Sequence, residues 1–338
     1  MPEGFVFVSE ARAQEYRPQH VRGGDLVFTC WGTIGQVGIV PEDGPYPEYI
    51  ISNKQLKLRV DRTIADPRFC FYYFASPRYA EYIRNRGIGG AVPGINLGIL
   101  KSLVIALPSI DVQGRAADFL TAYDDLIENN RRRMALLEEA ARQLYREWFV
   151  RLRFPGYEHT AISDGVPDGR ERMPFENALI LQRGFDLPVQ DREEGDFPVV
   201  GSRGIVGFHS RSKVRGPGVV TGRSGSLGDV HFIPHDFWPL NTALWVKEFK
   251  RVSPFFGMFL MRELDLKQYN GGASVPTLDR KAVHRIEVLV PPQRMIRAFD
   301  EVVRPLVDQI SCLELLAKKL LVARDLLLPR LMSGEIVV

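Results

Sequence analysis

The 338-residue sequence contains very little cysteine and no long apolar run. Its three cysteines, Cys30, Cys70 and Cys312, form no CxxC pair, which argues against a disulfide framework or a cysteine-rich zinc site. No apolar stretch approaches the roughly 20 residues needed to span a bilayer. The first five residues have neither a basic start nor an apolar signal core. These absences predict a cytoplasmic protein that makes no use of a membrane.

Motifs for nucleotide-driven chemistry and for metal binding are also missing. There is no Gly-x-x-x-x-Gly-Lys-Ser/Thr loop, so an ATP motor is not expected. The glycines within 222–228 are spaced like part of a dinucleotide loop, but they lie between two predicted strands, which favours a hairpin turn. His231 and His235 are four residues apart, yet Pro234 prevents a helix from placing both on one face. We therefore predict no catalytic residue, no metal site and no cofactor in this chain.

What the sequence does contain is an internal repeat. The run Gly-Thr-Ile-Gly-Gln-Val at 32–37 reappears as Gly-Ser-Leu-Gly-Asp-Val at 225–230. The run Gly-Gly-Ala-Val-Pro at 89–93 reappears as Gly-Gly-Ala-Ser-Val-Pro at 271–276, and an apolar strand follows each. A long amphipathic helix follows each copy. Two copies of a globular unit and a helix predict a pseudo-two-fold molecule, which suits a target with two parts.

The two long helices share one apolar register. In the first, apolar residues three and four apart form a coiled-coil seam of roughly four heptads. Adding the 183 residues that separate Pro108 from Pro291 reproduces the seam in the second helix, which two unrelated amphipathic helices would not do. Asn130 and Arg324 are polar residues at seam positions and are expected to fix register rather than carry chemistry. The predicted helix-pairing residues are Ile127, Asn130, Met134, Leu137, Leu144, Trp148, Ile310, Leu313, Leu320 and Leu327.

The predicted fold class is α+β, with two strand-rich domains separated by a pair of long antiparallel coiled-coil helices in a pseudo-two-fold internal repeat. The helices must run antiparallel because the second starts from the globular domain that hangs from the end of the first. Pro305 is expected to mark the first turn of the second long helix, after a short lead-in helix. A helix is expected near Arg68–Arg84, and strands at Leu26–Thr29, Gln36–Val40, Gln55–Val60, Leu103–Leu107, Phe197–Val200, Gly218–Thr221, Asp229–Ile233 and Ala243–Val246.

The distribution of positive charge is more informative than the net charge of +3. No acidic residue lies between Asp196 and Asp229, whereas Arg203, Arg211, Lys213, Arg215 and Arg223 lie there. Smaller basic runs occupy 49–60 and 82–110. A basic run is often only a solvated face, but all three runs lie in the globular domains and none on the long helices. Such an arrangement is what contacts to phosphates require.

Several motifs resemble the specificity subunit of type I restriction–modification systems. The run 21–29 (Val-Arg-Gly-Gly-Asp-Leu-Val-Phe-Thr), followed by Trp-Gly-Thr-Ile-Gly at 31–35, resembles the strand and turn of its target recognition domain. The run Asp-Asp-Leu-Ile-Glu-Asn-Asn at 124–130, continuing to Pro155, resembles its central conserved helix. The ending 327–336 resembles its distal helix terminus.

The resemblance implies a non-catalytic protein that reads a split sequence of double-stranded DNA. Residues 1–108 and 156–291 would be its two target recognition domains, and 109–155 and 292–338 its central and distal conserved helical regions. The helices would dock two methyltransferase subunits, which carry S-adenosylmethionine, and restriction subunits can join. The second domain has 69 residues (156–224) before the repeated turn, whereas the first has 31 (1–31), so the first is expected to be shortened by 38 residues.

The residue types themselves favour recognition over catalysis. The only Pro-Pro, at Pro291-Pro292, lacks the flanking residues of the element that holds a target base in amine-directed DNA methyltransferases. Two alternatives remain, a helical scaffold whose globular units bind protein, and an enzyme with an unfamiliar site. Arg and Lys bind phosphates and guanine edges. The predicted DNA-binding residues are Trp31, Thr33, Lys54, Arg84 and Arg86 in the first domain, and Arg203, His209, Arg211, Lys213, Arg223 and Ser226 in the second.

Overall fold

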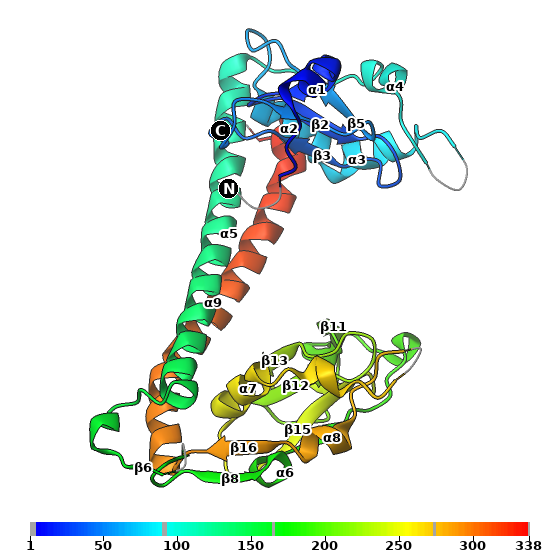
Figure 1. Cartoon of the computed structure of the whole chain (residues 1–338). Coiled ribbons are helices and arrows are strands. Elements are labelled where there is room, and N and C mark those ends of the chain that lie inside the picture. Colours follow the sequence, from blue (N-terminus) through cyan, green and yellow to red (C-terminus); the bar gives the residue numbers. More distant parts are fainter. Residues whose placement is uncertain (1–4, 90–92, 164–165, 273–274, 337–338) are drawn as a thin grey trace. The chain divides into compact units, whose positions relative to one another are not determined.

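The computed structural model describes residues 5–89, 93–163, 166–272 and 275–336 (Figure 1). Runs of strands in mainly antiparallel sheets are followed by runs of helices, which confirms the predicted α+β class. Within the described ranges, no helix is both long and apolar enough to cross a membrane.

The chain divides into two compact units, which we describe separately. Unit 1 comprises Met1–Arg132 together with Leu313–Val338, and unit 2 comprises Arg133–Cys312. Two long helices, α5 (Ile110–Tyr145) and α9 (Gln293–Met332), contribute residues to both units.

Unit 1 is built on a three-stranded antiparallel sheet in the order β3-β2-β5. The central strand buries Leu26 and Phe28 on one face, as its alternating pattern requires, and Phe74 packs edge-to-face on Phe28. The strands are β1 (His20–Val21), β2 (Leu26–Thr29), β3 (Val37–Ile39), β4 (Tyr49–Ile50) and β5 (Gln55–Leu58). The short helices are α1 (Glu10–Glu15), η1 (Arg17–Gln19), α2 (Pro67–Ala75), α3 (Pro77–Arg84) and α4 (Leu97–Lys101).

The single helix expected near Arg68–Arg84 is wrong, because two helices, α2 and α3, meet there. Pro77 cannot donate a helical hydrogen bond and is favoured in a first turn, and a new helix begins at it. The hydroxyl of Ser76 accepts from the backbone N–H of Tyr79 and caps α3.

The strand expected at Leu103–Leu107 is also wrong, because the chain forms neither helix nor strand there. Its counterpart in unit 2, β16 (Glu287–Val290), pairs with β8 (Glu171–Pro174). Among the described residues of unit 1, no strand corresponds to β8. Tyr79 instead donates its hydroxyl to the carbonyl of Val104 at 2.7 Å. Strand propensity alone therefore did not produce a strand.

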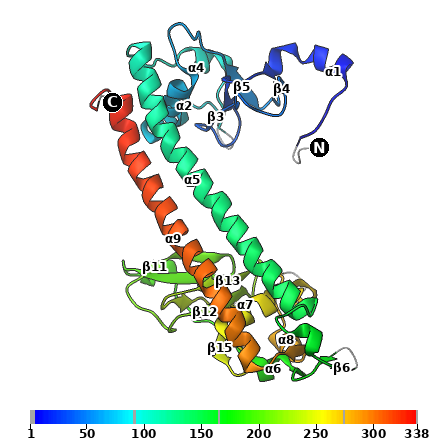
Figure 2. The ribbon, with the colours of Figure 1, turned by 90° about the vertical axis from the view of Figure 1, so that its left-hand side faces the viewer.

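The parts of α5 and α9 that belong to unit 1 run antiparallel and pack on α2 (Figure 2). Ala117, Leu120 and Leu328 are buried there with Phe69. Asp124 and Arg324 form an ion pair between the two helices, 2.5 Å from Oδ1 to Nη1. Asn130 is buried, and its Nδ2 has no hydrogen-bond partner.

Unit 2 contains a four-stranded antiparallel sheet in the order β13-β12-β15-β9, with α7 packed against it. A second sheet has the order β11-β10-β14. The strands are β6 (Ile162–Ser163), β7 (Val166–Pro167), β8, β9 (Leu179–Arg183), β10 (Phe197–Gly201), β11 (Gly204–His209), β12 (Gly218–Gly222), β13 (Val230–Ile233), β14 (Trp238–Pro239), β15 (Ala243–Phe249) and β16. The helices besides α5 and α9 are η2 (Arg146–Val150), η3 (Tyr157–His159), α6 (Phe175–Ala178), η4 (Val189–Asp191), α7 (Pro254–Glu263), η5 (Leu266–Tyr269) and α8 (Arg280–His284).

In unit 2 the two long helices meet in an aromatic cluster. Phe299 of α9 packs against Tyr145, Trp148 and Phe149, with ring centroids 5.1–6.0 Å apart. The helix break expected before Pro305 is wrong, because α9 is continuous. Pro305 is exposed, whereas its neighbours Val303 and Val307 are buried. The packing of this inner face holds the helix together although proline removes one hydrogen bond.

The ten predicted helix-pairing residues all lie on the less accessible side of their helices. Four are buried, namely Ile127, Asn130, Trp148 and Leu313. The other six are half-buried, namely Met134, Leu137, Leu144, Ile310, Leu320 and Leu327.

Candidate nucleic-acid interface

Each unit carries the same glycine turn, held by the same backbone hydrogen bonds. In unit 1 the N–H of Gly32 donates to the carbonyl of Pro93 at 3.0 Å. In unit 2 the N–H of Gly225 donates to the carbonyl of Pro276 at 2.9 Å. The two runs that the sequence repeats are therefore joined to each other in both units. Both turns close antiparallel hairpins, β2–β3 and β12–β13, as expected for the second.

The turn glycines have a backbone conformation that other residues rarely adopt. Gly32 and Gly35 have φ of +79° and +86°, and Gly225 and Gly228 have +83° and +88°. A side chain is strained at such angles because its Cβ crowds the following carbonyl. Glycine at these four positions therefore preserves one turn shape in both units.

The segment after the repeated proline also has one structure in both units. The N–H of Ile95 donates to the carbonyl of Cys30 at 3.0 Å, and the N–H of Leu278 donates to that of Arg223 at 2.8 Å. The next residues, Asn96 and Asp279, cap the short helices α4 and α8 with their side chains. The scaffold is thus repeated, whereas the side chains that it presents differ.

The residues predicted to bind DNA in unit 1 all lie at the surface. Thr33, Lys54 and Arg84 are exposed, and Trp31 is 52% exposed. The guanidinium of Arg86 lies 3.4 Å from the ring centre of Tyr82, a cation–π contact. Two other cations of this unit serve the fold instead, since Lys57 donates to the carbonyl of His20, and Arg59 pairs with Asp25.

The four predicted cations of unit 2 precede the glycine turn in sequence, and two of them have contacts at or beside it. Arg203 donates to the hydroxyl of Ser226 at 2.9 Å, which joins two predicted residues at the turn. Arg223 donates to the carbonyl of Asn241 at 3.2 Å. Arg211 is exposed, and the exposed Lys213 lies 5.1 Å from the ring centre of Trp238.

His209, also predicted to bind DNA, is only 5% exposed. Its Nδ1 accepts from the N–H of Glu193 at 3.0 Å, and its ring lies edge-on against Trp238. Both contacts lock the ring inside the fold. The His209 ring is therefore not exposed for contact with DNA.

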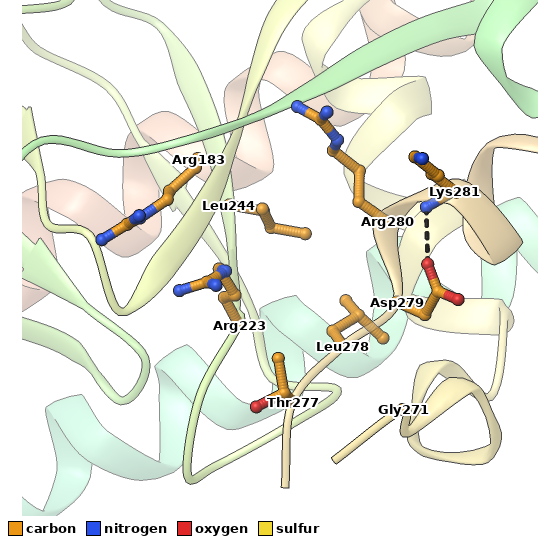
Figure 3. Close-up of a pocket in the computed structure, with 9 residues that line it drawn as sticks. All are labelled: Arg183, Arg223, Leu244, Gly271, Thr277, Leu278, Asp279, Arg280 and Lys281. Atoms are coloured by element: carbon orange, nitrogen blue, oxygen red, sulfur yellow. Dashed lines mark hydrogen bonds between the residues drawn. The ribbon is translucent and has the colours of Figure 1, made fainter.

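A pocket of about 440 Å³ lies beside the glycine turn of unit 2 (Figure 3). Arg183 and Arg223 lie on one side of it, and Arg280 and Lys281 lie on the other. Leu244 and Leu278 lie between them. Asp279 is the single acid of the lining, and its Oδ1 accepts from the backbone N–H groups of Lys281 and Ala282.

Sequence reasoning missed three of these four cations. Arg183 ends β9, and Arg280 and Lys281 begin α8, so the fold brings distant segments together around Arg223. Aligning Asp279 with Asn96 in the repeat would have drawn attention to the two residues after the cap. Across the described part of the chain, no group of three or more His, Cys, Asp or Glu side chains is placed to hold a metal ion.

Comparison with known proteins relates the chain to a family of DNA specificity proteins. Residues 11–139 match the family described as type I restriction modification DNA specificity domain. The chain is 24% identical to the MjaIX specificity subunit of Methanocaldococcus jannaschii, over 93% of this chain and 78% of the relative. Residues 11–139 thus carry the specificity domain of type I restriction–modification systems, and nearly the whole chain is similar to a specificity subunit. Such subunits recognise DNA sequence in their complexes, and the catalytic activities reside on other subunits.

Two further similarities agree with this family. The HindI specificity subunit of Haemophilus influenzae is 29% identical over 126 residues, which cover 37% of this chain and 28% of the relative. The crystal structure of the specificity subunit from M. genitalium shares the fold, with a TM-score of 0.60 at 18% identity, covering 92% of this chain and 83% of that one.

Proposed function

We propose that this specificity subunit reads a bipartite DNA sequence, one half with each globular unit, and docks two methyltransferase subunits through α5 and α9. The observation that carries the proposal is the repeated scaffold. Gly32–Pro93 and Gly225–Pro276 are the same hydrogen bond in two units whose exposed side chains differ. One scaffold with two sets of side chains suits two half-sites of different sequence.

The proposed DNA interface consists of the exposed residues that surround the turns and the basic runs. In unit 1 these are Trp31, Thr33, Lys54, Arg84 and Arg86, and in unit 2 they are Arg203, Arg211 and Lys213, to which the half-buried Arg223 and Ser226 are added. Cations supply the contacts to phosphates, and the polar and aromatic side chains beside the turns are available to base edges.

The proposed docking surface for methyltransferase subunits is the outer side of the long helices. It carries apolar residues that a solvated helix does not need, namely Leu126 and Leu136 on α5 and Leu315, Val322 and Leu326 on α9. Each is at least half exposed. Val322 and Leu326, four residues apart on one face of α9, support an interaction site there. Restriction subunits would join the same assembly.

Methylome sequencing tests this proposal. Cells that carry this subunit with its methyltransferase partner should show one methylated motif made of two short sequences and an unspecified gap. The purified subunit alone should transfer no methyl group from labelled S-adenosylmethionine to the same DNA, and adding the partner should restore transfer. A continuous motif would refute bipartite reading, and methyl transfer by the subunit alone would refute a purely recognising role.

A further inference from the structure

The pocket beside the glycine turn of unit 2 has a chemistry that its counterpart in unit 1 lacks. Four cations, Arg183, Arg223, Arg280 and Lys281, surround one acid, Asp279. One carboxylate oxygen of Asp279 already accepts two backbone N–H groups of α8, at 2.9 and 3.2 Å. The lining therefore carries an excess of three positive charges that are not neutralised within the pocket.

The cations are held in different ways, which leaves two of them available to a ligand. Arg223 gives one N–H to the carbonyl of Asn241, and Arg183 lies 3.9 Å from Asp186. Arg280 and Lys281 are exposed in the first turn of α8. Between the two pairs lie the apolar side chains of Leu244 and Leu278 (Figure 3).

The repeat identifies the equivalent positions in unit 1. In unit 2 the N–H of Leu278 donates to the carbonyl of Arg223. In unit 1 the N–H of Ile95 donates to the carbonyl of Cys30, so Cys30 corresponds to Arg223. Leu97 and Gly98 follow the cap of α4 as Arg280 and Lys281 follow the cap of α8. Among the described residues of unit 1, no strand corresponds to β9, which carries Arg183.

At these positions unit 1 presents apolar groups in place of cations. Leu97 is 51% exposed, Cys30 is buried, and Gly98 has no side chain. Beside these positions lie Trp31 and Ile88, both bridged to Gly94, which are 52% and 51% exposed. The same backbone thus carries a cationic pocket in one unit and an apolar surface in the other. The two units differ in the side chains at this surface, since the backbone hydrogen bonds that build the scaffold are the same in both.

We infer that the pocket formed by Arg183, Arg223, Arg280 and Lys281 binds a backbone phosphodiester of the DNA at the second half-site, and that unit 1 has no equivalent phosphate contact. The inference rests on the proposed function. Guanidinium and ammonium groups around a hollow suit a phosphate, because each can donate to its oxygens and neutralise its charge. Such contacts position the duplex without reading its bases.

The test is the salt dependence of DNA binding by the full-length subunit assembled with its methyltransferase partner. The variant Arg280→Ala/Lys281→Ala removes two exposed cations and keeps the cap of α8. Each lost phosphate contact should lower the slope of log K against log salt by about 0.9, so the double variant should lose about 1.8. Affinity should fall roughly tenfold for each contact at about 50 mM salt.

A matched control removes two cations from the same unit outside the pocket. Lys247→Ala/Lys250→Ala changes exposed residues at and beyond the far end of β15 from Leu244. This control should keep the wild-type slope. An equal drop in both variants would mean that only the net charge matters and would overturn the inference, as would an unchanged slope in Arg280→Ala/Lys281→Ala.

A reciprocal variant tests the difference between the units. Leu97→Arg places a cation at the position in unit 1 that corresponds to Arg280, and it should steepen the salt slope by up to about 0.9. Leu97→Ala, which adds no charge, should not steepen it. A wild-type slope in Leu97→Arg would overturn the correspondence between the two surfaces.

Two results separate this inference from its alternatives. If the wild-type complex does not bind duplex DNA, the proposed function itself fails. Titration with inorganic phosphate at constant ionic strength tests whether the pocket binds a free anion. If Arg280→Ala/Lys281→Ala abolishes phosphate binding but leaves the DNA slope unchanged, the pocket serves a free anion and the inference is overturned.

Discussion

Asp124 and Arg324, 200 residues apart in sequence, are joined by a 2.5 Å ion pair between the two long helices of unit 1. The other oxygen of Asp124 accepts from the hydroxyl of Tyr72 on α2 at 2.7 Å. Burial raises the pKa of Tyr72, so this hydroxyl stays protonated and remains a donor. One carboxylate therefore connects three helices at a seam that is otherwise mainly apolar.

Replacing Asp124 by alanine should destabilise unit 1 by about 1–3 kcal/mol, because Arg324 keeps only Asp325 as a partner and Tyr72 loses its 2.7 Å acceptor. Asp125→Ala, which changes the exposed neighbour, is the control and should stay within about 0.5 kcal/mol of wild type. Denaturant unfolding followed by hydrogen exchange in α2 measures both. The pair Asp124→Leu/Arg324→Met should recover much of the loss, since apolar groups can replace an ion pair that is partly removed from water.

Gly35 and Gly32 allow steric strain to be separated from backbone strain. Both have positive φ, but a Cβ at Gly35 would lie 2.8 Å from the carbonyl oxygen of Ala80, whereas one at Gly32 would meet nothing within 4 Å. Gly32→Ala should cost about 1 kcal/mol, and Gly35→Ala about 1–3 kcal/mol more. If thermal unfolding shows the same loss of stability in both variants, contact with α3 does not restrict this turn.

Asp25 should make unit 1 sensitive to acid. Burial acts to raise its pKa, but the bonds from Arg59 and from the N–H of Arg22 outweigh burial and hold the pKa below its usual value. Because the folded pKa is the lower one, the stabilisation is present above about pH 4 and is lost as pH falls through the folded pKa.

The measurement for Asp25 is hydrogen exchange in β2 and β5 as pH is lowered from about 5 to about 2. Asp25→Asn should be less stable near neutral pH and should lose little further stability in this window. Asp43→Asn, at an exposed position, should keep the wild-type profile. A wild-type profile in Asp25→Asn would show that the Asp25 carboxylate does not cause the acid sensitivity of unit 1.

Lengthening both long helices tests whether they set the gap between half-sites. Seven residues added within 138–145 of α5 and within 306–312 of α9 keep the apolar seam in phase. The added rise is roughly 10.5 Å, or about three base pairs. The gap should widen by up to about three pairs while both half-sites persist.

The duplex would also turn by roughly 100° over the added pairs, so activity can fall. Five-residue insertions, which rotate the seam away from its partner, should be tolerated less well. The methylated motif is the measurement. An unchanged gap with good activity, or altered half-site bases, would show that the helices do not measure the spacer.

Local patterns in the sequence determined the repeated elements. Glycines at 32, 35, 225 and 228 predicted the turns because only glycine adopts their backbone angles without strain, and heptad spacing predicted the long helices. Where local patterns failed, contacts with other segments of the chain decided the secondary structure. Leu103–Leu107 has strand composition but no neighbouring strand in the described part of unit 1, and Pro305 lies within a helix whose inner face is well packed.

The binding surface depended most on tertiary structure. Composition located basic runs, but within one run Lys57 and Arg59 bind groups of the fold while Lys54 is exposed. His209 lies in the longest acid-free stretch and is nevertheless buried. The cations at 183, 223, 280 and 281 meet only because β9, the glycine turn and α8 converge. Whether a charge faces solvent or a partner is set by contacts between distant segments, which no local pattern encodes.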